Sequence, residues 1–382
     1  MKDVLLVGLG AVGSVLSYSL NLSQRVRLTT VARGNYKQIQ NAGMNLKSER
    51  YGDIKGWKPD RVVSSVADAA DRQYSHVMLA TKCIPEVIKT PEILKPLLSP
   101  PYSNRFQQPT YVLLQNGLNI ERDLYHAIKS LGQSEPRIVN TGIYLLANQV
   151  APNVVTHGPF VQMFLGLYRH NDFTTTVNSP QEQALLENLK GLYHAKCRCH
   201  YISRDSTQEI CEKYDKRCVF WLELSDKFNR FSLSAVYRPP PTDTPYQPYV
   251  EPATADRVEK YTKGWIRDIL MELVTLGRAL GYPDSEDGLP SSIMQQYMTT
   301  LEKDYSTPSI DHRPSTLLDI ENGYPLEVEV IWGELVRMAK ERNVDIPRIE
   351  MSYAILVLVQ NQILRQRNSK LLRENTGLAG KV

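Results

Sequence analysis

The stretch VLLVGLGAVG, residues 4–13, lies close to the start of the chain and decides how it folds. An apolar run ends in a GxGxxG pattern and an amphipathic segment follows to about Leu22, which predicts a strand, a tight turn and a helix. Gly8 permits the turn, Gly10 lets a ligand approach the backbone, and Gly13 lets the helix pack closely on the strand. Unpaired N–H groups at a helix start bind phosphate, so the pattern is typical of a dinucleotide-binding turn, with a ligand-free Gly-rich turn as the alternative. The residues expected to contact the cofactor here are Gly8, Leu9, Gly10, Ala11, Val12 and Gly13.

The end of the second predicted strand indicates which dinucleotide binds. The run VRLTTV at 26–31 predicts that strand, and Ala32 and Arg33 follow where NAD-selective sites carry Asp or Glu. A carboxylate would repel a 2′-phosphate, whereas a guanidinium can hold it through two hydrogen bonds. We therefore expect Arg33, helped by Lys37, to favour NADPH over NADH. The alternative is a solvated arginine in a loop.

Composition limits the remaining classes of protein. The chain has 382 residues, 42% hydrophobic and 23% charged, which suits two globular domains or one large one. A net charge of +4 argues against a dedicated nucleic-acid surface, although residues 365–381 are locally basic. No apolar stretch approaches the length of a membrane span, and the first core strand begins almost at Met1, so we expect a cytoplasmic protein.

The five cysteines do not follow a disulfide framework, and we expect reduced thiols. Cys197, Arg198, Cys199 and His200 suggest a metal site at first sight. However, residues 194–201 alternate as a strand does, which places the two cysteines together on one face. We interpret them as core residues and expect no metal.

The chain divides into an α/β part and a helical part. Strand-like segments alternate with helical ones up to about residue 203, which predicts an N-terminal Rossmann-type, doubly wound domain over residues 1–203. Helical periodicity then predicts an all-α domain over residues 204–368, with a Pro-rich insertion at 238–252 and a basic tail at 369–382. The insertion is expected to be a surface excursion, with a polyproline ligand for a partner as the alternative. The expected later strands are 77–80, 111–115, 138–146, 154–156, 161–168 and 195–202, and the expected helices are 211–236, 253–280, 317–342 and 349–365.

Two polar signals follow strands of the α/β part. Lys82 follows the strand at 77–80, and Asn116 follows the strand at 111–115. Open α/β sheets bind ligands at the carboxyl ends of their strands, so an ammonium and an amide there can contact the nicotinamide ribose and the substrate edge. A solvated lysine and a plain Asn-Gly turn are the alternatives.

These motifs together resemble the ketopantoate reductase family, also called 2-dehydropantoate 2-reductase. The resemblance runs to about Gln362, and its most specific part is the run from Ser315 to Glu327. It implies an N-terminal Rossmann domain and a C-terminal helical domain with the active site in the cleft between them. A homodimer formed through the helical domain is a further expectation. The other segments that carry the resemblance are GLGAVGS at 8–14, Arg33, ATK at 80–82 and QNG at 115–117.

The family reaction implies the roles of several residues. Hydride would pass from NADPH to the ketone of a 2-oxo acid such as ketopantoate, in pantothenate biosynthesis, and the developing alkoxide would be protonated by a lysine. By position in the motif, Glu327 would bind the substrate hydroxyl groups in the catalytic centre and Ser315 would contact the carboxylate. A surface carboxylate in the first turn of a helix is the alternative for Glu327.

The catalytic lysine of the family is absent from its expected place. When the family pattern is aligned on Trp221, Glu223 stands at the position of the lysine. Phe231 stands where the family has a later amide side chain, and the loss of this hydrogen-bond partner favours a more apolar substrate. Lys227 lies one helical turn beyond Glu223 and can deliver its ammonium to nearly the same place, with Glu223 orienting it. An exposed ion pair without chemistry is the equal alternative. Lys82 is a second candidate proton donor.

Two hypotheses from different classes follow. The first is an NADPH-dependent reductase of ketopantoate or a related 2-oxo acid. The second is a catalytically silent NADP-binding relative that acts as an interaction or regulatory protein through its helical half. The intact cofactor motif fits both, the altered lysine position favours the second, and Ser315 with Glu327 favours the first.

Overall fold

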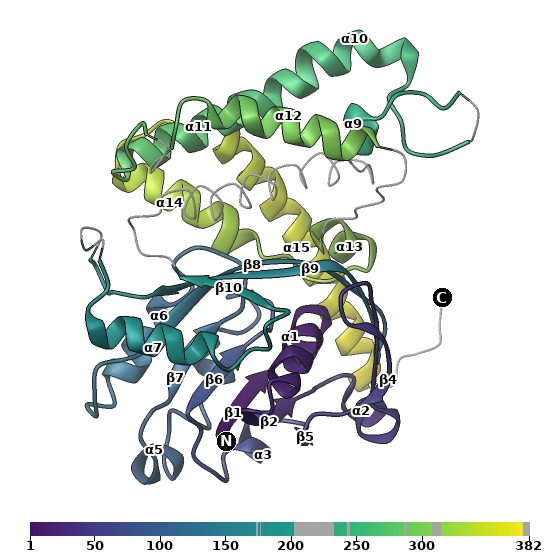
Figure 1. Cartoon of the computed structure of the whole chain (residues 1–382). Coiled ribbons are helices and arrows are strands. Elements are labelled where there is room, and N and C mark those ends of the chain that lie inside the picture. Colours follow the sequence, from purple (N-terminus) through teal and green to yellow (C-terminus); the bar gives the residue numbers. More distant parts are fainter. Residues whose placement is uncertain are drawn as a thin grey trace. The chain divides into compact units, whose positions relative to one another are not determined.

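The computed structural model describes residues 1–172, 175, 177–201, 233–242, 245–285, 289–307 and 315–376. The chain forms two compact units, Met1–Asp205 and Ser206–Val382 (Figure 1). The first is an α/β unit and the second is helical, which confirms the predicted fold class. Within the described ranges, no helix combines the length and the apolar character needed to cross a membrane.

A mixed sheet, with ten strands among the described residues, forms the centre of the first unit. Its order is β4-β3-β9-β8-β7-β6-β1-β2-β5, and β10 pairs with β9 outside this path. The strands are β1 (Lys2–Val7), β2 (Val26–Val31), β3 (Met44–Ser48), β4 (Gly52–Trp57), β5 (Arg61–Val63), β6 (His76–Leu79), β7 (Thr110–Leu113), β8 (Ile138–Ala151), β9 (Val154–Leu167) and β10 (Arg198–Tyr201). The helices of this unit are α1 (Ala11–Leu22), α2 (Tyr36–Ala42), α3 (Val66–Ala69), α4 (Thr90–Ile93), α5 (Tyr102–Arg105), α6 (Arg122–Lys129) and α7 (Pro180–Lys190).

The parallel half of the sheet aligns the strand ends that carry the predicted site. β1 lies between β2 and β6, and its buried apolar run is typical of a strand covered on both faces. Val7 lies opposite Val31 on one side and opposite Leu79 on the other, and Leu79 lies opposite Leu113. Because the chain leaves β1 toward β2 and returns at β6, the strand order reverses here, which is where open sheets bind ligands.

The rest of the sheet contains antiparallel pairs. β8 and β9 form a long hairpin, and β9 also pairs in parallel with β3 and β10. The prediction of separate strands at 154–156 and 161–168 is wrong, because β9 continues through both ranges while shifts in its register with β8 absorb the irregularity. The hairpin of β3 and β4 was not predicted, since both strands are short and β4 is mostly exposed with little apolar periodicity.

The alternation predicted around the paired cysteines is confirmed. Cys197 and Cys199 are buried with their Sγ atoms 3.5 Å apart, whereas Arg198 between them is exposed. Both pack in the main core cluster together with Tyr193. Among the described cysteines, Cys83, Cys197 and Cys199 form no disulfide bond. The described residues contain no group of three His, Cys, Asp or Glu side chains arranged to hold a metal ion.

The described elements of the second unit are helices. A nearly continuous run from residue 252 to residue 279 contains a π-helical segment, and a second π-helical segment precedes α14. The elements are α9 (Ser234–Tyr237), η1 (Pro252–Thr254), α10 (Ala255–Arg257), η2 (Val258–Lys263), α11 (Gly264–Ala279), α12 (Ile293–Ser306), α13 (Ser315–Glu321), η3 (Glu329–Gly333), α14 (Glu334–Glu341) and α15 (Pro347–Thr376).

The predicted helices at 253–280 and 349–365 are confirmed, and the predicted helix at 317–342 is corrected. The helical run at 253–280 ends as expected at Gly281, whose φ of +95° suits a helix C-terminus. The prediction of one helix over 317–342 is wrong, because Gly323 adopts a φ of +64° and the chain leaves the helix there. α15 continues into the range predicted as a tail, and all but the end of the predicted helix at 211–236 lies outside the described residues.

The described part of the Pro-rich insertion contains no helix before η1 begins at Pro252. Its Tyr246 hydroxyl donates a hydrogen bond to the carbonyl oxygen of Pro239 at 2.6 Å, and the guanidinium of Arg238 lies 5.6 Å from the centre of the Tyr246 ring. These contacts join Tyr246 to Arg238 and Pro239 at the start of the insertion. The insertion therefore has internal structure, which a solvated polyproline stretch would lack.

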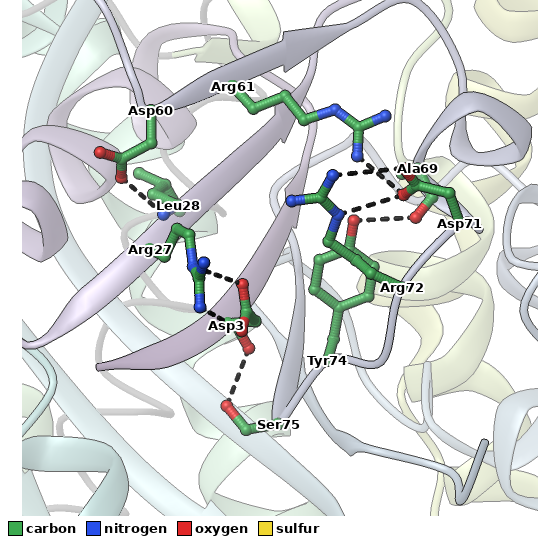
Figure 2. A network of polar contacts seen from close by, with 10 residues as sticks. All are labelled: Asp3, Arg27, Leu28, Asp60, Arg61, Ala69, Asp71, Arg72, Tyr74 and Ser75. Atoms are coloured by element: carbon green, nitrogen blue, oxygen red, sulfur yellow. Dashed lines mark hydrogen bonds and ion pairs between the residues drawn. The ribbon is translucent and has the colours of Figure 1, made fainter.

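The amino ends of the parallel strands are joined by a charged network (Figure 2). Arg27 forms two contacts with the Asp3 carboxylate, at 2.9 and 3.2 Å, which link β1 to β2. The guanidinium groups of Arg72 and Arg61 both contact Asp71 and hold the pKa of its carboxyl at about 2. This network lies at the end of the strands opposite the glycine turn, so we interpret it as a structural feature.

We predict that His76 makes the fold sensitive to acid. His76 is 5% exposed at the start of β6, and its burial, with smaller effects from Lys2 and Arg137, lowers the pKa of its imidazole from 6.5 to about 4. Between pH 6.5 and pH 4 the unfolded chain therefore binds a proton at His76 that the folded chain does not bind. The free energy of unfolding is highest above about pH 6.5 and falls by about 3 kcal/mol in total as the pH falls toward 4. Chemical denaturation between pH 4 and pH 7.5 measures this loss.

The His76→Gln variant should show a flatter pH dependence over that range. His126→Gln, at an exposed position of α6, is the matched control and should keep the wild-type slope. An unchanged slope in His76→Gln would contradict the assignment.

Candidate active site

The glycine turn is held by contacts that only glycine permits. Gly8 has a φ of +104° and donates its N–H to the carbonyl oxygen of Val31 at 3.0 Å. A Cβ added to Gly13 would lie 1.9 Å from the carbonyl oxygen of Gly8, so α1 can approach β1 this closely only without a side chain. A Cβ on Gly10 would instead meet a single atom within 4 Å, the Oε1 of Gln149 at 3.8 Å. Gly10 therefore borders open space, as close approach of a ligand requires.

The start of α1 fits an anionic group. Its N-cap residue, Gly10, offers no side chain to bond the first N–H groups, and its first turn contains no acidic residue. The positive end of the helix dipole and the N–H groups of Ala11 and Val12 are therefore not neutralised by a local carboxylate. The pyrophosphate of a dinucleotide has the charge and the acceptors that this helix start lacks.

Arg33, which the sequence predicts to select the dinucleotide, follows the second strand of the sheet. It lies two residues beyond β2 and is exposed, and Lys37 is exposed on the following helix α2. Within the described part of the chain, neither side chain forms an ion pair. Since no neighbouring carboxylate neutralises it, the Arg33 guanidinium can hold a 2′-phosphate.

Lys82 and Asn116 lie at the ends of the next two strands. Both are exposed, three residues beyond β6 and β7 respectively, and both have contacts with other groups of the protein. The buried amide of Gln115 braces these ends, because its Nε2 donates to Thr81 Oγ1 at 3.1 Å and its Oε1 accepts from Thr90 Oγ1 at 3.4 Å. Three strand spacings separate β7 from β2, which is about 14 Å and suits an extended dinucleotide.

Ser315 and Glu327 belong to the second unit. Ser315 is exposed at the first residue of α13, whereas Glu327 is 7% exposed immediately before a helical turn. The Gln360 side chain of α15 fixes the preceding residue by donating to Leu326 O at 3.0 Å and accepting from Leu326 N at 2.8 Å. The alternative of a surface carboxylate at Glu327 is therefore wrong, since this carboxyl is buried on a braced segment.

The structure brings some of the predicted residues together. Gly8–Gly13, Arg33, Lys82 and Asn116 share one edge of the first unit, because the strand register aligns the ends that carry them. Glu223 and Lys227 lie outside the described residues. Their binding and catalytic roles stay predictions.

The sequence patterns did not reveal the residues that brace this edge. Gln115 was noted only as part of a turn motif, although it bonds across to Thr81. Asn35, which bonds to Leu9 and Pro152, was not identified at all. Gly34-Asn35 is a turn signal, but its partners are distant in sequence, so no local pattern indicates them.

Comparison with known families agrees with this geometry. A family profile described as ketopantoate reductase PanE/ApbA matches residues 4–170, and one described as its C-terminal part matches residues 252–360. The chain belongs to the ketopantoate reductase PanE/ApbA family. Family and fold together place it among NAD(P)-dependent, ketopantoate reductase-like oxidoreductases.

Relatives and solved structures span nearly the whole chain. The uncharacterized protein YDL144C of Saccharomyces cerevisiae is 23% identical over an alignment of 397 positions, which covers 98% of this chain and 98% of that protein. A 2-dehydropantoate 2-reductase from Methylococcus capsulatus superposes with a TM-score of 0.67 at 20% identity and covers 94% of this chain and 97% of its own. A ternary structure of D-mandelate dehydrogenase with NADH and anilino(oxo)acetate has a TM-score of 0.67 at 15% identity, with 94% and 99% coverage. At these identities the superpositions establish the fold.

We predict that Gly13→Ala disrupts both the fold and the proposed cofactor site. The added methyl would overlap the Gly8 carbonyl, and overpacking of this kind costs about 1–3 kcal/mol or more. Thermal unfolding of the full chain should show a lower midpoint for Gly13→Ala. Gly34→Ala is the matched control, because a Cβ there meets nothing within 4 Å, and its midpoint should stay within error of wild type. Equal midpoints for the two variants would show that the close approach of α1 does not limit stability.

Proposed function

We propose that the protein is an NADPH-dependent reductase of ketopantoate or a related 2-oxo acid. The observation that carries the proposal is the shared edge of the first unit, where an uncapped helix start, an arginine without an ion-pair partner in the described chain and two further polar residues lie at aligned strand ends. In the strand order β2, β1, β6 and β7, these groups fit the 2′-phosphate, the pyrophosphate and the nicotinamide ribose.

The residues of the chain would divide the chemistry among them. When bound, NADPH would supply the hydride that reduces the substrate ketone. The N–H groups of the glycine turn would hold the cofactor, Ser315 would bind the substrate carboxylate, and Glu327 would bind its hydroxyl groups. Lys227, oriented by Glu223, or alternatively Lys82 would donate a proton to the oxygen of the former ketone.

We predict that Arg33 determines the cofactor preference. Wild type should bind NADPH more tightly than NADH, and Arg33→Ala should lose roughly tenfold or more in NADPH affinity, because a charge-assisted bidentate contact with the 2′-phosphate is removed. NADH affinity should change little. Quenching or enhancement of nicotinamide fluorescence in titrations measures both constants. Equal affinity of wild type for the two cofactors would contradict this role.

We further predict that one lysine supplies the proton. NADPH consumption should be observed with ketopantoate or another member of a panel of 2-oxo acids, and Lys227→Ala or Lys82→Ala should abolish turnover. NADPH affinity should be retained in Lys227→Ala, whereas Lys82→Ala should also lose a contact with the nicotinamide ribose. Lys340→Ala is the control, since this lysine pairs with Glu350 on the surface of the helical unit. Full activity in both Lys227→Ala and Lys82→Ala would exclude them as donors.

One observation favours a second candidate function. Glu223 occupies the position where the family carries its lysine, which is compatible with a catalytically silent relative that binds NADP and acts through a partner. The buried, braced position of Glu327 favours the reductase, because a disused substrate residue has no need of it. Tight NADPH binding without turnover on any 2-oxo acid would favour the silent alternative. A homodimer through the helical unit, a cytoplasmic location and a role in pantothenate biosynthesis stay predictions.

A further inference from the structure

Asn35 connects three segments of the first unit. Its side-chain amide donates one hydrogen bond to the carbonyl oxygen of Leu9 at 2.8 Å and a second to the carbonyl oxygen of Pro152 at 3.0 Å. Leu9 lies within the glycine turn, and Pro152 lies at the tip of the hairpin formed by β8 and β9. Arg33 is only two residues before Asn35, so the turn that contains Arg33 is bonded to both the glycine turn and the hairpin tip.

Asn35 makes these bonds in place of a local one. It occupies the N-cap position of α2, where asparagine usually bonds the first N–H groups of its own helix, yet its side chain makes no capping hydrogen bond. A missing cap of this type destabilises the start of the helix. Both hydrogens of the amide are instead used between segments, so the side chain serves the relative placement of those segments.

The hairpin tip lies beside the phosphate-binding turn. Besides Asn35, the Pro152 carbonyl accepts a hydrogen bond from Gln149 Nε2 at 2.8 Å. The Oε1 atom of the same Gln149 is the closest atom to a Cβ built on Gly10, at 3.8 Å. The hairpin tip is therefore part of the wall around Gly10.

We propose that Asn35 is a positioning residue that sets the spacing between the glycine turn and Arg33, and thereby the preference for a 2′-phosphorylated dinucleotide. The inference rests on the proposed function, because it concerns the same cofactor site. The hydrogen bond from the Asn35 amide fixes the direction of the Leu9 carbonyl. The negative end of this peptide dipole therefore cannot turn toward a pyrophosphate. The second hydrogen bond joins the same amide to the Pro152 carbonyl of the hairpin. The turn that contains Arg33 is therefore bonded both to the glycine turn and to the hairpin.

This arrangement affects the two dinucleotides differently. NADPH would contact both the glycine turn and Arg33, so its affinity depends on the spacing between them. NADH has no 2′-phosphate, so its affinity does not depend on the spacing between the glycine turn and Arg33. Loss of the Asn35 amide should therefore lower the affinity for NADPH more than the affinity for NADH.

The test compares cofactor affinities of full-length variants by fluorescence titration with NADPH and NADH. Asn35→Ala should lower NADPH affinity roughly tenfold and reduce the ratio of NADPH to NADH affinity, because two hydrogen bonds to backbone carbonyls are lost. Asn35→Gln keeps an amide donor and should recover part of the ratio. Asn45→Ala is the matched control, since this asparagine bonds the Gly56 N–H at 2.9 Å on the β3–β4 hairpin.

The affinity ratio separates positioning from a general loss of structure. A loosened fold would weaken both dinucleotides equally and leave the ratio unchanged, so an unchanged ratio in Asn35→Ala overturns the inference while the proposed function stands. An equal fall of the ratio in Asn45→Ala also overturns it. Wild-type protein that fails to bind NADPH overturns both the inference and the proposed function.

Discussion

The close approach of α1 to β1 is the constraint on which the first unit depends. With hydrogen atoms alone at Gly8 and Gly13, the helix begins directly at the carboxyl end of the strand, and the 1.9 Å separation calculated for a Cβ on Gly13 shows how little room remains. This approach directs the helix N-terminus at the strand edge. It also leaves the first N–H groups without a side-chain cap, and uncapped N–H groups at a helix start need an anion or water as a partner.

The register of the parallel strands brings the carboxyl ends of β1, β2 and β6 to one edge of the sheet. Because Val7 is level with both Val31 and Leu79, the segments after β1, β2 and β6 emerge side by side. Charge is distributed unequally between the two ends of these strands. At the amino ends, Arg72 and Arg61 are paired with Asp71, whereas at the carboxyl ends Arg33 has no carboxylate partner in the described chain. The charges at the amino ends are satisfied within the protein, whereas the Arg33 guanidinium is available to a ligand.

The sequence predicts those features that depend on neighbouring residues. The strand, turn and helix around Gly8–Gly13 follow from periodicity and from the steric needs of glycine, and the burial of Cys197 and Cys199 follows from strand alternation. The break at Gly323 was missed because a left-handed residue inside an apolar pattern resembles a tolerated helical glycine. Asn35 was missed because its partners are distant along the chain, and only the fold brings them within hydrogen-bond distance.

The central claim is that one sheet edge holds NADPH through the glycine turn and Arg33. A crystal structure of the full-length protein with NADP⁺ tests it most directly. The account predicts the pyrophosphate at the N–H groups of Ala11 and Val12 and the 2′-phosphate within hydrogen-bond distance of the Arg33 guanidinium. A nucleotide bound elsewhere, or bound here with its 2′-phosphate turned away from Arg33, would contradict it.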